Sequence, residues 1–156
     1  IMKKGIRLEQ SKKAVAWCKR IGMEVRAYFM VNNIGETKQT IRETIDFAKS
    51  LDPDYVDFEI VHPYPGSELR CIVENHPRCH IVPKKWNDWN AQTGNEIVFW
   101  QDGLSVEDIA KGWETAVKEF YVRPKQFLRF AKKMNSFQNF KDIIRSGLNV
   151  VFARAR

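Results

Sequence analysis

Two β-rich segments that flank one amphipathic helical segment constrain the fold of this chain more than any other feature of its sequence. Residues 25–31 (VRAYFMV) are almost continuously apolar, which predicts a strand buried on both faces of a parallel sheet. Residues 55–61 alternate apolar and acidic side chains, which predicts a second strand with one apolar and one polar face. Residues 37–51 between them have helical spacing and begin with Thr37, a good capping residue. Because a helical crossover joins parallel strands and is right-handed, the sequence predicts a βαβ unit of an α/β fold.

Further helices are expected on both sides of this unit. Residues 8–21 carry an amphipathic helical pattern, which Gly22 should end. After the second strand, Ser67 can cap a short helix. Ser105 and Asp108 form a capping-box pattern, which predicts a helix that runs to about residue 122.

The rest of the chain suggests three successive parts. Residues 71–103 are read as an irregular excursion with one short β-like run over residues 96–100. Two amphipathic helices are expected over residues 124–134 and 137–146. We therefore divide the chain into a β/α portion, the excursion and a helical C-terminal region, at residues 1–70, 71–103 and 104–156.

The positive charge of the chain is concentrated at one end. Residues 123–156 contain nine Lys or Arg and a single acidic residue, Asp142, whereas the formal charge of the whole chain is +7. This segment is either an electrostatic footprint for nucleic acid or another anion, or the solvated basic face of terminal helices. We favour the second interpretation, because no aromatic stacking platform or nucleic-acid motif accompanies the charge.

Composition also bears on where the protein works. The three cysteines are few and odd in number, which favours a reducing compartment over a disulfide framework. No run of 18 or more apolar residues occurs, and the first residues lack the pattern of a secretory signal. We expect a cytoplasmic protein without a membrane partner, and the first residue, Ile1, suggests that the chain is part of a longer protein.

The turns that follow the two predicted strands are the candidate site. In α/β folds, ligands bind outside the carboxyl ends of parallel strands, where loops converge and helix N-termini offer donors. The first turn, residues 32–36, includes Gly35, which permits close backbone approach and precedes a helix start with free N–H groups. The second turn, residues 62–66, is stiffened by two prolines. From spacing alone, each turn could equally be a simple connection between elements.

These segments resemble a known enzyme family. Residues 25–37, 41–48, 53–55 and 63–69, in this order and spacing, are similar to radical S-adenosylmethionine enzymes of the cobalamin-binding type. That group includes enzymes similar to the anaerobic magnesium-protoporphyrin monomethyl ester cyclase. The likeness covers about residues 3–69 and is fairly specific. It implies the C-terminal part of a partial (β/α)6 TIM-like barrel, with the two strands as the fifth and sixth, followed by a helical C-terminal region.

The resemblance also implies a cofactor and its contacts. The family holds the adenine and ribose side of S-adenosylmethionine at the ends of its fifth and sixth strands. The corresponding residues of this sequence are Asn32, Asn33, Gly35, Glu36, Val61, His62 and Pro63. Many relatives have Gly where Asn32 stands, which puts close ligand approach at that position in question.

The family's 4Fe–4S cluster would have to be held outside this chain. The family binds the cluster through a Cys-x3-Cys-x2-Cys loop, and that spacing does not occur here. We therefore expect the whole protein to cleave S-adenosylmethionine and act on a small molecule, and this piece alone to be inactive.

The expected partners of this chain are the missing N-terminal half of the barrel and, as in the cobalamin-binding relatives, a cobalamin domain. Its unpaired strand edge should favour association with another chain. The sequence identifies neither the substrate nor a catalytic residue.

Two acidic side chains on the second strand should face the inside of the fold. Asp57 and Glu59 share one strand face, and an outer face packed under helices would hold two carboxylates only at a high cost. The nearest predicted partner is Arg26 on the neighbouring strand. These groups form either a structural ion pair or part of a polar wall that faces the substrate.

One group of sulfur and nitrogen side chains has the chemistry of metal ligands. Four such residues fall within ten positions: Cys71, His76, Cys79 and His80. Their spacing matches no structural zinc pattern, so we predict a turn with ordinary polar residues and assign no metal ligand.

One rival hypothesis from another class remains open. The chain could be a non-catalytic α/β module whose basic helical tail binds nucleic acid or a partner protein. A three-cysteine loop upstream of this sequence would favour the enzyme.

Overall fold

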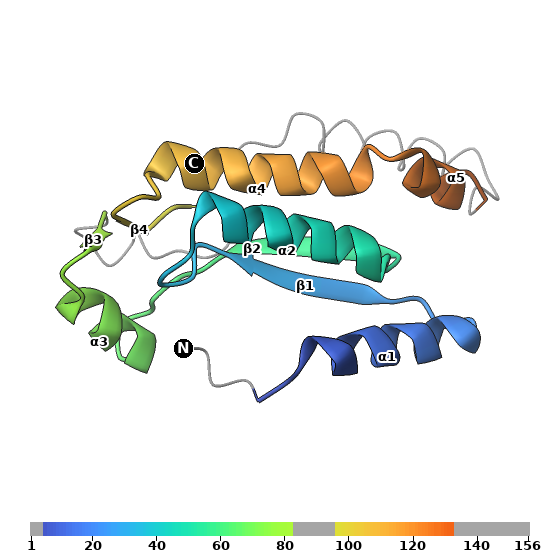
Figure 1. Cartoon of the computed structure of the whole chain (residues 1–156), viewed down its shortest axis with the longest axis horizontal. Coiled ribbons are helices and arrows are strands. Elements are labelled where there is room, and N and C mark those ends of the chain that lie inside the picture. The colour runs from blue at the N-terminus through green and yellow to red at the C-terminus, as the bar shows by residue number, and fades with distance from the viewer. Residues whose placement is uncertain (1–4, 83–95, 133–156) are drawn as a thin grey trace.

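The computed structural model describes residues 5–82 and 96–132, which form a mixed α/β structure (Figure 1). The helices are α1 (Leu8–Arg20), α2 (Lys38–Leu51), α3 (Glu68–Asn75), α4 (Val106–Tyr121) and α5 (Pro124–Lys132). The strands are β1 (Arg26–Val31), β2 (Tyr55–Ile60), β3 (Cys79–Ile81) and β4 (Phe99–Gln101). The predicted helix over residues 137–146 lies outside the described residues. No helix of the described part is long and apolar enough to cross a membrane.

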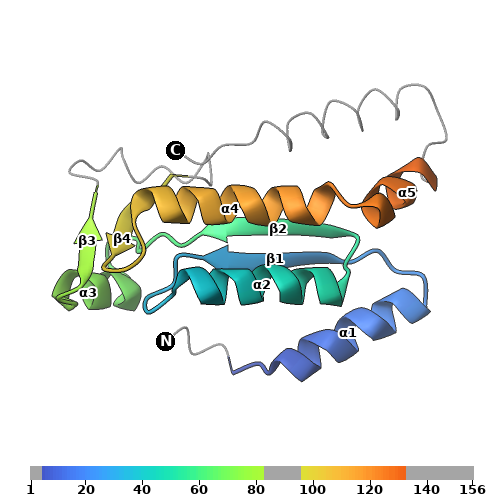
Figure 2. The same cartoon turned by 45° about the horizontal axis from the view of Figure 1, so that its top comes forward.

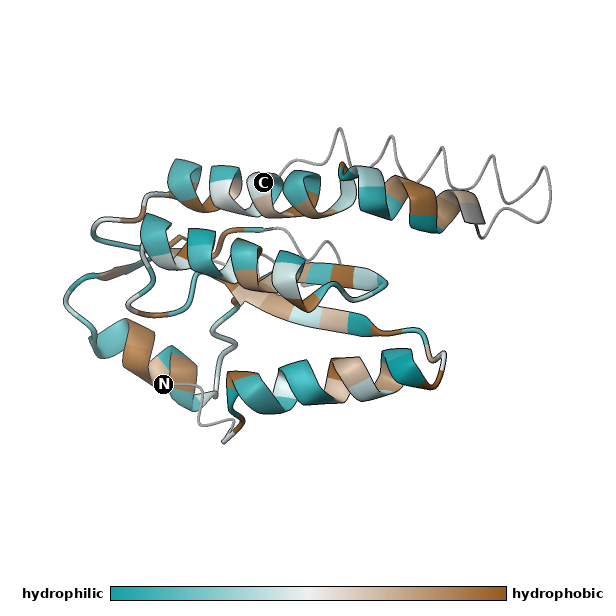
Figure 3. Cartoon of the chain, turned by 45° about the vertical axis from the view of Figure 1, so that its right-hand side comes forward, coloured by the Kyte–Doolittle hydropathy of each residue, from teal (hydrophilic) through white to brown (hydrophobic). Residues whose placement is uncertain are grey.

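Strands β1 and β2 are parallel and connected through α2, which confirms the predicted βαβ unit. Their register runs from Arg26 opposite Tyr55 to Val31 opposite Ile60. Helices α2 and α4 lie together on one side of this sheet, and their outward sides are largely hydrophilic (Figures 2 and 3). The main core lies between the helices and the sheet. Its fully buried members include Ala48, Leu104, Ile109, Ala116 and Phe120.

The helix starts follow the predicted caps. The hydroxyl groups of Thr37, Ser67 and Ser105 accept hydrogen bonds from backbone N–H groups in the first turns of α2, α3 and α4. Ser105 and Asp108 form the predicted capping box. Helix α1 ends before Gly22, whose φ of +76° is a conformation that suits glycine.

The sheet face opposite the main core is polar. Arg26 and Tyr28 on this face of β1 are exposed, so the prediction that β1 is buried on both faces is wrong for this chain. The side chains of Asp57 and Glu59 are on the same side as Arg26, away from α2 and α4. The guanidinium Nη1 of Arg26 lies 3.0 Å from Asp57 Oδ2, which agrees with the first of the two alternatives, an ion pair.

The two edges of the sheet differ. The Tyr121 hydroxyl, on α4, accepts a hydrogen bond from Val56 N (3.0 Å) and donates one to Val56 O (2.6 Å). Trp113 Nε1, also on α4, donates to Phe58 O (2.6 Å). These bonds occupy the backbone of β2 on the side away from β1, so helix α4 closes that edge. Strand β1 has no second partner strand among the described residues, so its free edge is where the sheet could gain another strand.

Residues 71–103 contain more regular structure than predicted. Helix α3 continues to Asn75, and β3 and β4 form an antiparallel pair. The expected strand over residues 96–100 is displaced to Phe99–Gln101, and its partner β3 was not predicted. A second apolar cluster joins this pair to the ends of the main strands: Ile34, Val61, Val73, Val98 and Phe99.

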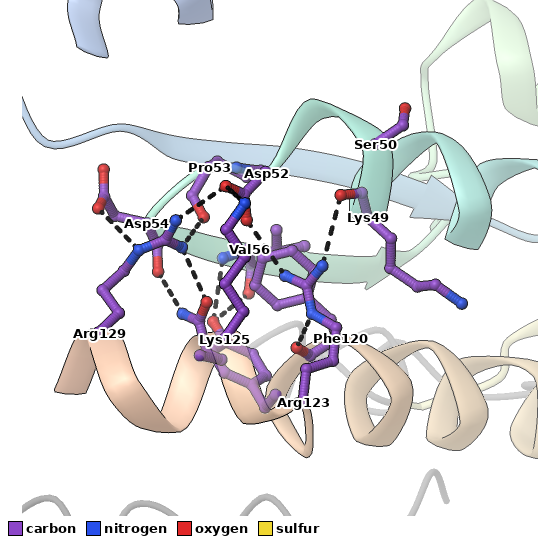
Figure 4. A network of polar contacts seen from close by, with 12 residues as sticks. Lys49, Ser50, Asp52, Pro53, Asp54, Val56, Phe120, Arg123, Lys125 and Arg129 are labelled. Carbon is purple, nitrogen blue, oxygen red and sulfur yellow. Dashed lines mark hydrogen bonds and ion pairs between the residues drawn. The ribbon is translucent and has the colours of Figure 1, made fainter. Parts of the chain in front are cut away.

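A charged cluster joins α5 to the loop that precedes β2 (Figure 4). Asp52, in the left-handed conformation at the end of α2, lies in this loop. Its Oδ2 is 3.0 Å from Lys19 Nζ, 2.8 Å from Lys125 Nζ and 3.0 Å from Arg129 Nη2. Arg129 also donates to Pro53 O (2.8 Å). The cluster fixes α1 and α5 against the amino end of the sheet.

The electrostatics of this cluster favour the charged carboxylate. Burial by itself would raise the pKa of Asp52, but hydrogen bonds from Lys125 and Lys19 and the charge of Arg129 lower it to about 2. Arg123 and Arg129, with side chains only 18% and 17% exposed, point toward Asp52. These two members of the basic segment therefore serve an internal ion cluster and do not form a solvated face. Most of the segment lies outside the described residues.

Candidate functional site

The turns after β1 and β2 meet at the carboxyl end of the sheet. Val61 N donates to Val31 O (2.9 Å), which continues the parallel pairing into the second turn. Ile34 and Val61 are buried in one apolar cluster together with β4. In Figures 1 and 2, α3, β3 and β4 gather at this end, whereas α5 lies at the opposite end. The structure thus brings the two sets of predicted site residues together.

The first turn is held by a side chain that sequence reasoning missed. Gln101, buried on β4, accepts a hydrogen bond from Gly35 N (2.7 Å) and donates to Asn33 O (2.8 Å). The Glu36 carboxylate accepts from the backbone N–H groups of Asn32 and Asn33. The turn therefore offers fewer free donors than predicted. Gln101 lies far away in sequence and carries no local signal that could have revealed this bond.

The environment of Glu36 is unusual for a carboxylate. Burial raises its pKa, and the two backbone hydrogen bonds oppose this effect without cancelling it. Gly35 beside it has a φ of +81°, and no atom of the described residues, apart from its chain neighbours, lies within 4 Å of the position that a Cβ would occupy. The turn therefore combines a shielded carboxyl group with open space next to the backbone.

Asn32 fills the position at which many members of the resembled family have glycine. Its φ is +71°, a left-handed conformation that asparagine tolerates better than most residues. The side chain is completely buried, and its Nδ2 donates to Phe99 O (2.8 Å). Asn32 thus adopts the glycine-like backbone while its side chain connects the turn to β4.

The second turn presents a histidine. His62 Nδ1 lies 2.7 Å from Ile60 O, and the imidazole stacks on the Tyr64 ring with centroids 5.9 Å apart. Val61 and Pro63 on either side are buried. The half-buried His62 therefore lies directly beyond the end of β2, whereas Pro65 of the same turn is exposed.

The sulfur and nitrogen ligands do not converge. Cys71 is exposed on α3, and Cys79 is half-buried on β3, where burial raises the pKa of its thiol. The His80 ring stacks on Trp100, and His80 Nε2 lies 3.0 Å from Asp102 Oδ1. Within residues 5–82 and 96–132, no group of three or more His, Cys, Asp or Glu is arranged to hold a metal ion.

The chain is similar in sequence to two proteins that are named as enzymes. Over 127 residues, 81% of the chain, it is 32% identical to an uncharacterised methyltransferase of Pyrococcus horikoshii. Over 62 residues, 40% of the chain, it is 34% identical to the anaerobic magnesium-protoporphyrin IX monomethyl ester cyclase of Rubrivivax gelatinosus. No family model matches the chain. The chain spans 26% of the length of the first relative, and the second match covers 11% of the cyclase.

Proposed function

We propose that this chain is the C-terminal part of a radical S-adenosylmethionine enzyme and that its two strand-end turns hold S-adenosylmethionine. The observation that carries this proposal is the meeting of the two turns at the carboxyl end of a parallel β1–β2 pair. Ligands of α/β folds bind at this end. The site comprises Asn32, Asn33, Gly35, Glu36, Val61, His62 and Pro63.

The edges of the sheet support the position of this piece in a longer protein. Helix α4 closes the β2 edge, as suits the last strand of a partial barrel, whereas β1 lacks a second partner strand in the described part. The Tyr28 ring on β1 is exposed beside this open edge. Further strands of the barrel would pair with β1 and could cover that ring.

The names of the relatives agree with the proposed cofactor. S-adenosylmethionine is the usual methyl donor of methyltransferases, and the first relative is named as one. The cyclase match agrees with the family resemblance of the strand and turn segments.

The residues of this chain do not fit an iron–sulfur cluster. Cys18 lies on α1, Cys71 on α3 and Cys79 on β3, so the three thiols do not share one loop. In the resembled family, the cluster supplies the electron that cleaves the cofactor. We therefore assign this chain the task of binding and orienting the cofactor, while the cluster ligands and any cobalamin domain belong to other parts of the protein.

The test uses the full-length protein that contains this chain, prepared anaerobically. Gly35→Val should weaken S-adenosylmethionine binding at least tenfold, because a β-branched side chain would occupy the open space and strain the left-handed backbone. Gly22→Val is a matched control. Gly22 has a φ of +76°, with no atom within 4 Å of its Cβ position, and lies at the opposite end of the sheet.

Affinity by calorimetry and products by chromatography give separate answers. Equal S-adenosylmethionine affinity for the folded Gly35 and Gly22 variants would remove the site from these turns. Formation of 5′-deoxyadenosine by the wild-type protein would support radical chemistry. Formation of S-adenosylhomocysteine alone would indicate simple methyl transfer.

A further inference from the structure

The β3–β4 hairpin holds the turn that follows β1 through three hydrogen bonds. The Gln101 amide accepts one from Gly35 N (2.7 Å) and donates one to Asn33 O (2.8 Å). The third joins Asn32 Nδ2 to Phe99 O (2.8 Å). Each bond connects segments 66 to 68 positions apart in the sequence. The shape of this turn therefore depends on the hairpin as well as on the residues of the turn.

The Gln101 side chain is committed to this turn. It is only 5% exposed, and both the oxygen and the nitrogen of its amide are bonded to the turn backbone. These bonds fix the two peptide groups that flank Ile34, whose side chain is buried against β4. One of these groups leads into Gly35, and glycine is otherwise the residue with the widest backbone freedom. The amide of Gln101 therefore restricts the turn at its least restrained position.

The hairpin gives Gln101 a firm support. Strands β3 and β4 pair over three residues each, and Asp102 N donates to Arg78 O (2.9 Å) just beyond the paired residues. The His80 and Trp100 rings stack across the two strands with centroids 4.0 Å apart. A side chain on a paired strand is placed more precisely than one on a free loop. The amide of Gln101 is therefore held at a defined position relative to the turn.

A second buried glutamine serves the other end of the sheet. Gln126, on α5, is completely buried. Its Nε2 donates to Asp54 O (2.6 Å), and its Oε1 accepts from Arg129 Nη1 (2.8 Å). Gln101 and Gln126 thus share residue type, burial and the use of both amide atoms, but only Gln101 contacts the candidate site. The two residues allow an effect on the site to be separated from an effect on stability.

We propose that Gln101 is a positioning residue, which raises the affinity for S-adenosylmethionine by holding the peptide groups around Ile34 in one arrangement. This inference rests on the proposed function and makes the β3–β4 hairpin, which lies outside the two barrel strands, part of the cofactor site. Gln101 acts through the turn and need not touch the cofactor. A turn that is already ordered loses less conformational entropy when a ligand binds, so its affinity is higher.

The experiment measures S-adenosylmethionine affinity by calorimetry, with the full-length protein prepared anaerobically and without a reductant. Gln101→Met keeps a side chain of similar length but removes both hydrogen bonds, and should weaken binding about tenfold. Gln126→Met is the matched control: thermal unfolding should show a similar loss of stability, while affinity stays within twofold of wild type. Hydrogen exchange of peptides that contain Gly35 should become faster in the Gln101 variant only.

A conservative variant provides a rescue that depends on pH. In Gln101→Glu, the ionised carboxylate can accept from Gly35 N but has no hydrogen for Asn33 O, whereas the protonated form can make both bonds. Burial raises the pKa of such a carboxyl group. The ratio of the variant's dissociation constant to that of wild type should therefore fall at least threefold between pH 8 and about pH 5.5. The same ratio for Gln101→Met should not change with pH.

The remaining outcomes separate this inference from the proposed function. If the folded Gln101→Met protein binds S-adenosylmethionine as tightly as wild type, or if Gln126→Met loses as much affinity, Gln101 does not position the site and the cofactor assignment still stands. If the wild-type protein does not bind S-adenosylmethionine, both proposals fail. Circular dichroism of each variant confirms that the fold is retained.

Discussion

The two ends of the β1–β2 sheet use polar side chains in opposite ways. At the amino end, Asp52 is surrounded by cations: Lys19 of α1, and Lys125 and Arg129 of α5, which are labelled in Figure 4. Its charge is therefore matched several times over. At the carboxyl end, Asn32 and His62 each retain a buried atom without a partner among the described residues. Asp52 Oδ1 and Arg123 Nη2 at the amino end also lack a hydrogen-bond partner among the described residues, but they form an ion pair at 3.7 Å. The opposite charges at that end therefore still compensate one another. We therefore expect the amino end to contribute stability and, under the proposed function, the carboxyl end to bind the cofactor.

The largest expected effect is at the amino end. Asp52→Ala should lower the local free energy of unfolding by about 2–3 kcal/mol, because several cations lose their counter-charge and alanine fits the left-handed backbone poorly. Hydrogen exchange of the β2 and α4 amides in the full-length protein measures this loss. Asp52→Asn should lower the local free energy of unfolding by less, because asparagine tolerates the same left-handed backbone. S-adenosylmethionine affinity should stay within twofold of wild type in both variants, and a tenfold change would contradict the division between the ends.

A smaller effect is expected along the closed edge that connects the two ends. Tyr121→Phe removes both hydrogen bonds to Val56 and should lower the local free energy of unfolding by about 1–2 kcal/mol. Tyr28→Phe is the control, because Tyr28 is exposed on the open sheet face. The same hydrogen-exchange measurement should show faster exchange in β2 for the first variant only. If the β2 amides are equally protected from exchange in the Tyr121→Phe and Tyr28→Phe variants, then α4 does not close this edge.

The smallest expected effect concerns stability: the contributions of the two sheet ends to the free energy of unfolding should depend on pH in opposite ways. The pKa of Asp52 falls from its usual 3.8 to about 2 in the folded state, so its contribution is present above pH 4 and is lost as pH falls through 2. This contribution amounts to about 2 kcal/mol at most. Burial raises the pKa of Glu36 above its usual 4.5, so its effect has the opposite sign: stability declines as pH rises through the folded-state pKa.

Two neutral variants separate these contributions. Asp52→Asn should flatten the loss of thermal stability between pH 4 and pH 2. Glu36→Gln, which keeps an acceptor for the backbone N–H groups of Asn32 and Asn33, should gain stability relative to wild type as pH rises above the usual carboxyl pKa of 4.5. Parallel pH profiles for the two variants would show that the ends do not differ in this respect.

Much of the fold could be predicted because its signals are local. The capping hydroxyls of Thr37, Ser67 and Ser105, and the alternation around Asp57 and Glu59, depend on neighbours a few residues away. The ion pair of Arg26 was predictable as well, since parallel strands place residues of one face side by side. The apolar run of residues 25–31 was misleading, because burial depends on which elements cover a strand and not on its composition alone.

The contacts that define the site came only from tertiary structure. Gln101 reaches Gly35 across 66 positions, and Tyr121 reaches Val56 across 65, so no short spacing records either hydrogen bond. The sequence by itself determined the βαβ order, the helix starts and the turns that resemble a cofactor site, since these follow from periodicity, capping and residue type. Only the packed structure decided which N–H groups of the turns are already bonded and which edge of the sheet is closed. It also decided which atoms of Asn32 and His62 lack a partner among the described residues, because hydrogen bonding between distant segments depends on their final positions in space.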